Sequence, residues 1–159
     1  MNNSLQEIVT AHPFVKGMKP EHQAVLYDCA RVVQYDPGTV LFNEGEPASE
    51  FYLVETGKVI LEVHDPGEET ALVAKVGPEG CFGWSWLYPP FVWHLSARVV
   101  EPTTALVLNG ARLLIHAEED HDFGYELMKR VSRILINRLQ STRRELLAKQ
   151  AKVPTLIAR

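Results

Sequence analysis

Cysteine is scarce in this chain of 159 residues, which contains only Cys29 and Cys81. The two residues are far apart in the sequence, and neither belongs to a Cys-x-x-Cys pair. The spacing typical of disulfide scaffolds, zinc ribbons and redox motifs is therefore missing. We expect both thiols to be buried side chains without a disulfide, metal or redox role.

Long apolar runs are also absent. No stretch approaches the roughly 18 uninterrupted apolar residues of a membrane span, and the first seven residues lack the basic flank and apolar stretch of a secretory signal. Hydrophobic residues make up 46% of the chain and charged residues 23%, which is the ordinary balance of a globular domain. The sequence therefore predicts one soluble, cytoplasmic domain that does not bind membranes.

The motifs that usually carry catalysis are missing as well. There is no His-x-His pair on a predicted strand, no His-Glu-x-x-His on a helix, no nucleophile elbow and no glycine-rich phosphate loop. The histidines are instead scattered along the chain, at His12, His22, His64, His94, His116 and His121. We expect the protein not to be an enzyme and to hold neither a metal nor a cofactor.

Positive charge is scarce in the body of the chain and concentrated at its end. Residues 1–128 hold 7 basic and 19 acidic side chains, a net charge of −12, whereas residues 129–159 hold 9 basic and 1 acidic side chain, a net charge of +8. A basic helix usually presents a solvated face, and no helix-turn-helix follows it that could read a DNA groove. We expect no direct DNA binding. An acidic protein partner is compatible with the basic helix.

Short apolar stretches between turn signals fill the region from 32 to 108, a pattern typical of an all-β domain. The predicted strands are 30–35, 39–42, 51–56, 58–64, 70–76, 81–83, 94–100 and 104–108. Breaks between them fall at turn-forming groups such as Thr56-Gly57-Lys58 and Glu101-Pro102-Thr103. Eight short strands favour a jelly roll or a related barrel.

Helical periodicity brackets this β region. A short helix follows Asn109-Gly110, and a long one runs from about 120 to 149, roughly 45 Å at about 1.5 Å per residue. The fold class is therefore α+β, mainly β. The predicted organisation is N-terminal helices in 1–29, a β-roll in 30–110, C-terminal helices in 111–150 and a tail in 151–159.

One stretch of the predicted roll reads Gly38-Thr39-Val40-Leu41-Phe42-Asn43-Glu44-Gly45-Glu46-Pro47-Ala48 and continues, from residue 51, as Phe51-Tyr52-Leu53-Val54-Glu55-Thr56-Gly57-Lys58-Val59. It resembles the opening of a cyclic-nucleotide-binding domain, and the resemblance extends over most of the chain. It implies short N-terminal helices, an eight-stranded jelly roll and a long C-terminal dimerisation helix. In the catabolite activator group of that family, the last helix dimerises and precedes a DNA-binding helix-turn-helix.

The ligand site of the family is a phosphate-binding cassette, a short helix after Phe-Gly-Glu with an Arg nine residues beyond the Glu. Here Trp84 stands in place of the Glu and Trp93 in place of the Arg. A neutral indole cannot offset the desolvation of a cyclic phosphate, so we expect cyclic AMP and cyclic GMP not to bind in the usual way. The candidate pocket consists of Phe82, Gly83, Trp84, Ser85, Trp93, His94 and Ser96.

This stretch is rich in aromatic side chains: Trp84, Trp86, Tyr88, Phe91 and Trp93. They either line a pocket for a less polar or planar ligand or plug the cavity, and we prefer the plug because an empty apolar void costs stability. Ser85, Ser96 and backbone N–H groups could still hold an anion weakly, and His94 could help only when protonated. Strand alternation turns Arg98 to the opposite face.

An apolar stripe recurs about every 3.6 residues along the long predicted helix. Its members are Met128, Val131, Leu135, Leu139, Thr142 and Leu146. The consecutive residues 134–136 spread apolar surface beyond one face, as expected where a helix packs both on its own roll and on a second helix. We predict a homodimer through this stripe, with complete packing on the chain's own domain as the alternative.

Together these features predict a stand-alone sensor or regulatory domain that signals through its C-terminal helix to a separate, unknown protein effector. The sequence is also compatible with an unidentified small-molecule ligand. One alternative is a ligand-free protein-interaction module whose pocket is plugged by tryptophans. Another is a truncated transcription regulator of the catabolite activator type.

Overall fold

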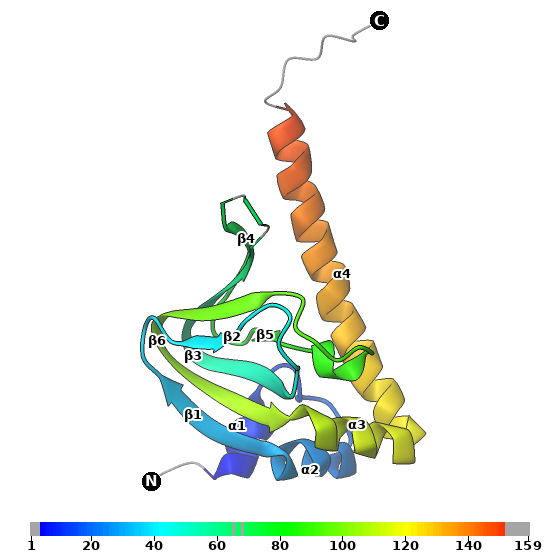
Figure 1. The fold of residues 1–159 in the computed structure, drawn as a ribbon. Coiled ribbons are helices and arrows are strands. Elements are labelled where there is room, and N and C mark those ends of the chain that lie inside the picture. Colours follow the sequence, from blue (N-terminus) through cyan, green and yellow to red (C-terminus); the bar gives the residue numbers. More distant parts are fainter. Residues whose placement is uncertain (1–3, 65, 68, 152–159) are drawn as a thin grey trace, which may run out of the picture.

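Six antiparallel strands in one sheet form the frame of the computed structural model, which describes residues 4–64, 66–67 and 69–151 (Figure 1). The strands follow the order β1-β6-β3-β4, with β2 paired to β6 and β5 paired to β3. Their bounds are β1 (Ala30–Tyr35), β2 (Val40–Phe42), β3 (Glu50–Val63), β4 (Ala71–Val76), β5 (Cys81–Phe82) and β6 (Ser96–Asn109). With the helices that flank this sheet, the predicted α+β class is confirmed, although more of the described residues lie in helices than in strands.

The helices lie at both ends of the chain, apart from one short turn. They are α1 (Leu5–Ala11), α2 (Pro20–Asp28), the one-turn 3-10 helix η1 (Ser85–Leu87), α3 (Gly110–Glu119) and α4 (His121–Ala151). Local chemistry explains where they begin: Pro20 starts α2, and the Asn109 side chain accepts a hydrogen bond from the Arg112 backbone N–H at the start of α3. The predicted tail, from residue 152 on, lies outside the described residues.

The prediction of eight strands is corrected to six for the part of the chain that the structure describes. Segments 51–56 and 58–64 are one strand, β3, and segments 94–100 and 104–108 are one strand, β6. The two turn-forming groups lie opposite each other, because Lys58 pairs with Glu101 while the register shifts on either side. Gly57 has a φ of 99°, and Thr103 Oγ1 accepts the Lys58 backbone N–H at 3.1 Å. These groups therefore bend the ladder without ending it.

The first turns of α4 belong to the core, whereas its last turns extend past the strands (Figure 1). Phe123, Leu127 and Val131 are fully buried. Arg130 ties α4 to the N-terminal segment by donating hydrogen bonds to the carbonyl oxygens of Phe14 at 2.7 Å and Lys16 at 2.9 Å. From Leu139 through Gln150 every residue is exposed. Among the described residues, no helix combines the length and apolar character needed to cross a bilayer.

Candidate functional site

A cavity of about 260 Å³ lies between the roll and the segment that follows β5. Its floor is apolar: the rings of Phe42 and Trp93 stack with centroids 3.7 Å apart at 12°, and Leu61 is fully buried beside them. The complete lining is Phe42, Leu61, Gly83, Trp84, Ser85, Tyr88, Trp93, His94 and Leu95.

Gly83 allows the chain to turn directly above this floor. Its φ is +87°, in the region that favours glycine, and an added Cβ would lie 3.2 Å from the Glu50 carbonyl oxygen and 3.3 Å from the Trp93 ring. The chain then forms the single turn of η1. Glycine at this position thus lets the Trp93 indole sit close against the backbone.

The polar groups of the cavity include a serine–histidine pair. Ser85 Oγ and His94 Nδ1 are 3.3 Å apart and hydrogen-bonded, Ser85 is buried, and His94 is exposed at the edge. Ser96 is used elsewhere, because its hydroxyl accepts the backbone N–H of Glu44 at 2.9 Å. The other polar side-chain groups of the described lining are the indole N–H groups of Trp84 and Trp93 and the Tyr88 hydroxyl.

The structure brings five of the seven candidate pocket residues to this cavity: Gly83, Trp84, Ser85, Trp93 and His94. Phe82 and Ser96 are not part of the lining. Phe82 is fully buried and stacks on Tyr52 with centroids 4.8 Å apart.

Three lining residues were missed: Leu95, Phe42 and Leu61. Tyr88 also belongs to the lining and was among the aromatic residues considered for a pocket, although it was not one of the seven candidates. Leu95 belongs to the cassette stretch itself, where its apolar character was a usable signal. Phe42 and Leu61 come from β2 and β3, and only the strand register brings them beside Trp93. No local sequence signal marks these two residues as pocket residues.

The tryptophans divide between pocket and core. Trp86 is 2% exposed and its indole N–H donates to the Gly83 carbonyl oxygen at 2.7 Å, so it supports the turn from within the core. Trp93 is 5% exposed and fills part of the space on the roll side. Trp84 is half-buried on the cavity wall. Features of both the plug and the pocket interpretation are therefore present together.

The described lining of this cavity holds no guanidinium. Arg98, 43% exposed, pairs with Glu62 at 2.8 Å on the outer face of the roll. None of the nine described lining residues is Asp, Glu, Lys or Arg. A ligand in this cavity would therefore meet aromatic rings, aliphatic groups and one hydroxyl–imidazole pair.

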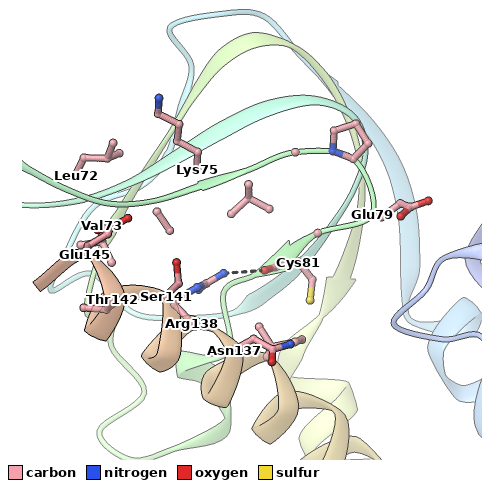
Figure 2. Close-up of a pocket in the computed structure, with 16 residues that line it drawn as sticks. Leu72, Val73, Lys75, Glu79, Cys81, Asn137, Arg138, Ser141, Thr142 and Glu145 are labelled. Atoms are coloured by element: carbon pink, nitrogen blue, oxygen red, sulfur yellow. Dashed lines mark hydrogen bonds between the residues drawn. The ribbon is translucent and has the colours of Figure 1, made fainter. Parts of the chain in front are cut away.

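The long helix touches the pocket wall through Arg138. Its guanidinium lies 4.8 Å from the ring centroid of Trp84, a cation–π contact, and its Nη2 donates to the Cys81 carbonyl oxygen at 3.3 Å (Figure 2). Burial lowers the pKa of the Arg138 guanidinium. Burial also raises the pKa of the Cys81 thiol to about 12, so that thiol is not a reactive thiolate.

Arg138 also borders a second and larger hollow, a groove of about 730 Å³ between β4 and α4 (Figure 2). One wall is the segment 72–81, and the other is formed by Ile134, Asn137, Arg138, Ser141, Thr142 and Glu145. The groove separates the C-terminal part of α4 from its own roll. That part of α4 therefore lacks a cover over much of its surface.

The predicted helix stripe is divided by this arrangement. Val131 is 0% exposed in the core of its own domain, so it is not available to a partner. Met128 is half-buried, and the Tyr88 hydroxyl lies 3.9 Å from its sulfur. The remaining members, Leu135, Leu139, Thr142 and Leu146, are exposed.

The described residues thus form an antiparallel roll with a cavity beside a one-turn helix, followed by a long C-terminal helix. The family "Cyclic nucleotide-binding domain" matches residues 32–119. Because this match covers more than half of the chain, the protein belongs to the cyclic nucleotide-binding domain family.

Relatives of known name agree with this assignment. The CRP-like cAMP-activated global transcriptional regulator of Mycobacterium tuberculosis is 25% identical over 142 residues, which are 89% of this chain and 62% of the relative. The chain thus spans less than two thirds of the length of this curated relative.

Two solved structures are also similar. A candidate cyclic nucleotide-binding protein from Geobacter metallireducens GS-15 is 27% identical with a TM-score of 0.76, covering 84% of this chain and 97% of that one. The catabolite activator protein of Thermus thermophilus is 25% identical with a TM-score of 0.67, covering 87% of this chain and 63% of that one.

Proposed function

We infer that this protein is a regulatory sensor domain whose pocket does not bind cyclic AMP or cyclic GMP in the usual way, and whose long helix signals to a separate protein. The chemistry of the pocket carries this proposal. Trp84 and Trp93 stand where the family has charged ligand contacts, and the described lining contains no charged residue. A cyclic phosphate placed there would lose water without gaining a fixed counter-charge.

The contact between Trp84 and Arg138 supports signalling through α4. Trp84 belongs to the wall of the cavity, and Arg138 belongs to the helix that extends beyond the domain. A ligand that shifts the Trp84 ring would change this contact, and the position of α4 would respond only if the ligand favours one of two helix positions.

The exposed part of the stripe supports a homodimer. Leu135, Leu139 and Leu146 present apolar surface on a helix segment that its own roll leaves uncovered. Aliphatic side chains at this spacing are the usual seam of two packed helices. We propose that a second copy covers this face and that the effector reads the helix pair.

Calorimetric titration with cyclic AMP and with cyclic GMP tests the proposed function. We expect dissociation constants in the millimolar range or weaker. The cAMP-activated relative from Mycobacterium tuberculosis is the positive control for the nucleotide and the instrument. A micromolar dissociation constant for either nucleotide would show that His94, Ser85 and backbone N–H groups replace the arginine, and the proposal would be wrong.

A second candidate function is a ligand-free interaction module. The observation in its favour is the stack of Trp93 on Phe42, which already fills the roll side of the cavity. Native mass spectrometry of the protein purified from its own cells separates the two candidates, because a sensor retains or exchanges a small molecule, whereas a plugged module carries none.

A further inference from the structure

We propose that the cavity beside Trp84 and Trp93 takes an uncharged, planar aromatic molecule of one or two fused rings that carries a single hydrogen-bonding group. This inference names the ligand class of the pocket and rests on the proposed sensor function. Three properties of the described lining lead to it: its ring-rich surface, its lack of fixed charge and its single polar pair.

The surface of the cavity suits a flat ring. Phe42 and Trp93 lie nearly parallel at the floor, and Trp84 and Tyr88 contribute further aromatic surface from the cassette side. Aromatic rings prefer offset-stacked or edge-to-face neighbours, and such pairs are favourable beyond the apolar area that they bury. A planar aromatic ligand would extend this arrangement of rings.

The scarcity of positive charge around the cavity disfavours an anion. The guanidinium nearest to Trp84 is that of Arg138, which already donates to the Cys81 carbonyl oxygen and is absent from the lining. The guanidinium of Arg98 is paired with Glu62. A carboxylate or phosphate in the cavity would therefore be desolvated without a partner, which is costly, whereas a neutral molecule avoids this penalty.

The Ser85–His94 pair fixes where the polar group of the ligand would point. A serine hydroxyl both donates and accepts hydrogen bonds, so Ser85 Oγ can donate to His94 Nδ1 and still accept from a ligand hydroxyl or N–H. Every other side chain in the described lining is apolar or aromatic, and the Tyr88 hydroxyl points to the Met128 sulfur. The indole N–H groups of Trp84 and Trp93 are further donors in the lining. We assign the hydrogen-bonding group of the ligand to the Ser85–His94 pair, because Ser85 Oγ can accept as well as donate.

The volume limits the size of the ligand. Pockets for drug-sized molecules enclose roughly 300–1,000 Å³, and this cavity encloses about 260 Å³. A single ring or two fused rings fit this space.

The experiment compares 2-naphthol with 2-naphthoate, two flat bicyclic probes that differ in charge. We expect calorimetry to give at least tenfold tighter binding for 2-naphthol, and NMR to show shifts at the indole N–H signals of Trp84 and Trp93 while that of Trp86 stays unchanged. Tighter binding of 2-naphthoate, or shifts confined to other residues, would overturn the ligand class.

Two variants locate the polar and electrostatic determinants. Ser85→Ala should weaken 2-naphthol about threefold to tenfold, the loss of one hydrogen bond, and leave the affinity for naphthalene unchanged. Leu95→Arg places a cation at the cavity and should reverse the preference toward 2-naphthoate. If Ser85→Ala weakens the binding of 2-naphthol and of naphthalene equally, the Ser85 hydroxyl has no role in ligand binding and this inference is wrong.

The two proposals fail separately. If neither naphthalene derivative binds at millimolar concentration while cyclic AMP and cyclic GMP also fail to bind, the ligand class is wrong and the nucleotide part of the proposed function stands. If cyclic AMP binds at micromolar concentration, the proposed function itself is wrong.

Discussion

Among single residues, Trp93 belongs both to the pocket lining and to the hydrophobic core. It is 5% exposed and stacks on Phe42, which is itself buried. Trp84 is half-buried and lies against Arg138 instead. Trp84 and Trp93, which we predict to replace the charged contacts of the family, should therefore contribute differently to stability.

Removing the Trp93 ring tests this difference. Trp93→Ala should lower the free energy of unfolding by about 3–5 kcal/mol, as deletion of a buried aromatic ring does, whereas Trp84→Ala should cost less because that ring is half-exposed. Urea unfolding followed by far-UV circular dichroism measures both. Equal losses for the two variants would contradict the assignment of Trp93 to the core.

His12 is a second residue whose environment predicts a measurable property. The Phe14 backbone N–H donates to its Nδ1 at 3.1 Å, so the ring proton is on Nε2 and is donated to the Val54 carbonyl oxygen at 3.2 Å. Burial lowers the pKa of His12 below its ordinary value of 6.5, despite the opposing hydrogen bond to Val54.

The pH dependence of stability follows from this shift. Below about pH 6.5 the unfolded chain takes up the His12 proton before the folded protein does, so the free energy of unfolding falls as the pH drops through this range and is constant above it. His12→Gln should flatten the dependence, while the exposed control His121→Gln should retain it. Urea unfolding across a pH series measures all three. An unchanged slope for His12→Gln would assign the dependence to other groups.

The bend that β3 and β6 share depends on close packing between these two strands. A Cβ at Gly57 would overlap Thr103 Oγ1 and the Pro102 carbonyl oxygen, whereas a Cβ at Gly38 meets nothing within 4 Å. Both glycines have positive φ, 99° and 91°. A side chain at Gly38 would therefore meet backbone strain alone, whereas a side chain at Gly57 would meet both backbone strain and steric overlap.

Alanine substitutions at Gly38 and Gly57 measure the two effects. Gly38→Ala should cost about 1–2 kcal/mol, the strain of a left-handed alanine, and Gly57→Ala should cost clearly more because neighbouring backbone must move. Thermal and urea unfolding of the two variants provide the comparison. If the two losses were the same, the close approach of β6 to Gly57 would have no energetic consequence.

The uncovered part of α4 gives a second prediction for an element. Leu139 is 69% exposed, so Leu139→Glu should leave the fold of the single chain intact but dissociate the proposed dimer, because a carboxylate would enter an apolar seam. Gln140→Glu adds the same charge one residue along and should remain dimeric. Sedimentation at micromolar concentration distinguishes these outcomes. A monomeric unmodified protein would refute the dimer.

At the level of the whole molecule, Arg138 connects the pocket wall to the long helix α4. Arg138 contacts Trp84 on one side and the Cys81 carbonyl oxygen on the other, and both partners belong to the segment around β5 that borders the cavity. Few other contacts hold this stretch of α4, because the groove of about 730 Å³ separates it from β4. Phe123, Leu127 and Val131 hold the first turns of α4 in the core. The position of the later stretch, residues 132–142, should depend on the Arg138 side chain.

Hydrogen exchange tests this dependence. Arg138→Gln should increase amide exchange both in residues 81–88 and in residues 132–142, since it removes a contact that the two segments share. Arg143→Gln removes the same charge from an exposed site on α4 and should alter neither segment. Increased exchange in the helix alone would contradict a coupling between helix and pocket.

The family could be predicted from the resemblance of residues 38–48 and 51–59, and the order of the parts from local features of the sequence. Turn chemistry and apolar periodicity act over a few residues, which is why the predicted long helix, about 120 to 149, is so close to α4 (His121–Ala151). The replacement of both charged ligand contacts by Trp84 and Trp93 stays a prediction, which the sequence allowed because the cassette is a continuous motif.

The tertiary structure alone decided which of these residues act together. Strand register brings Phe42 and Leu61 to Trp93 and turns two predicted breaks into bends. Packing sends Trp86 and Val131 into the core and places Arg138 on Trp84. Each of these outcomes depends on contacts between residues far apart in the chain, and local periodicity is the same whichever distant surface an apolar side chain finally meets.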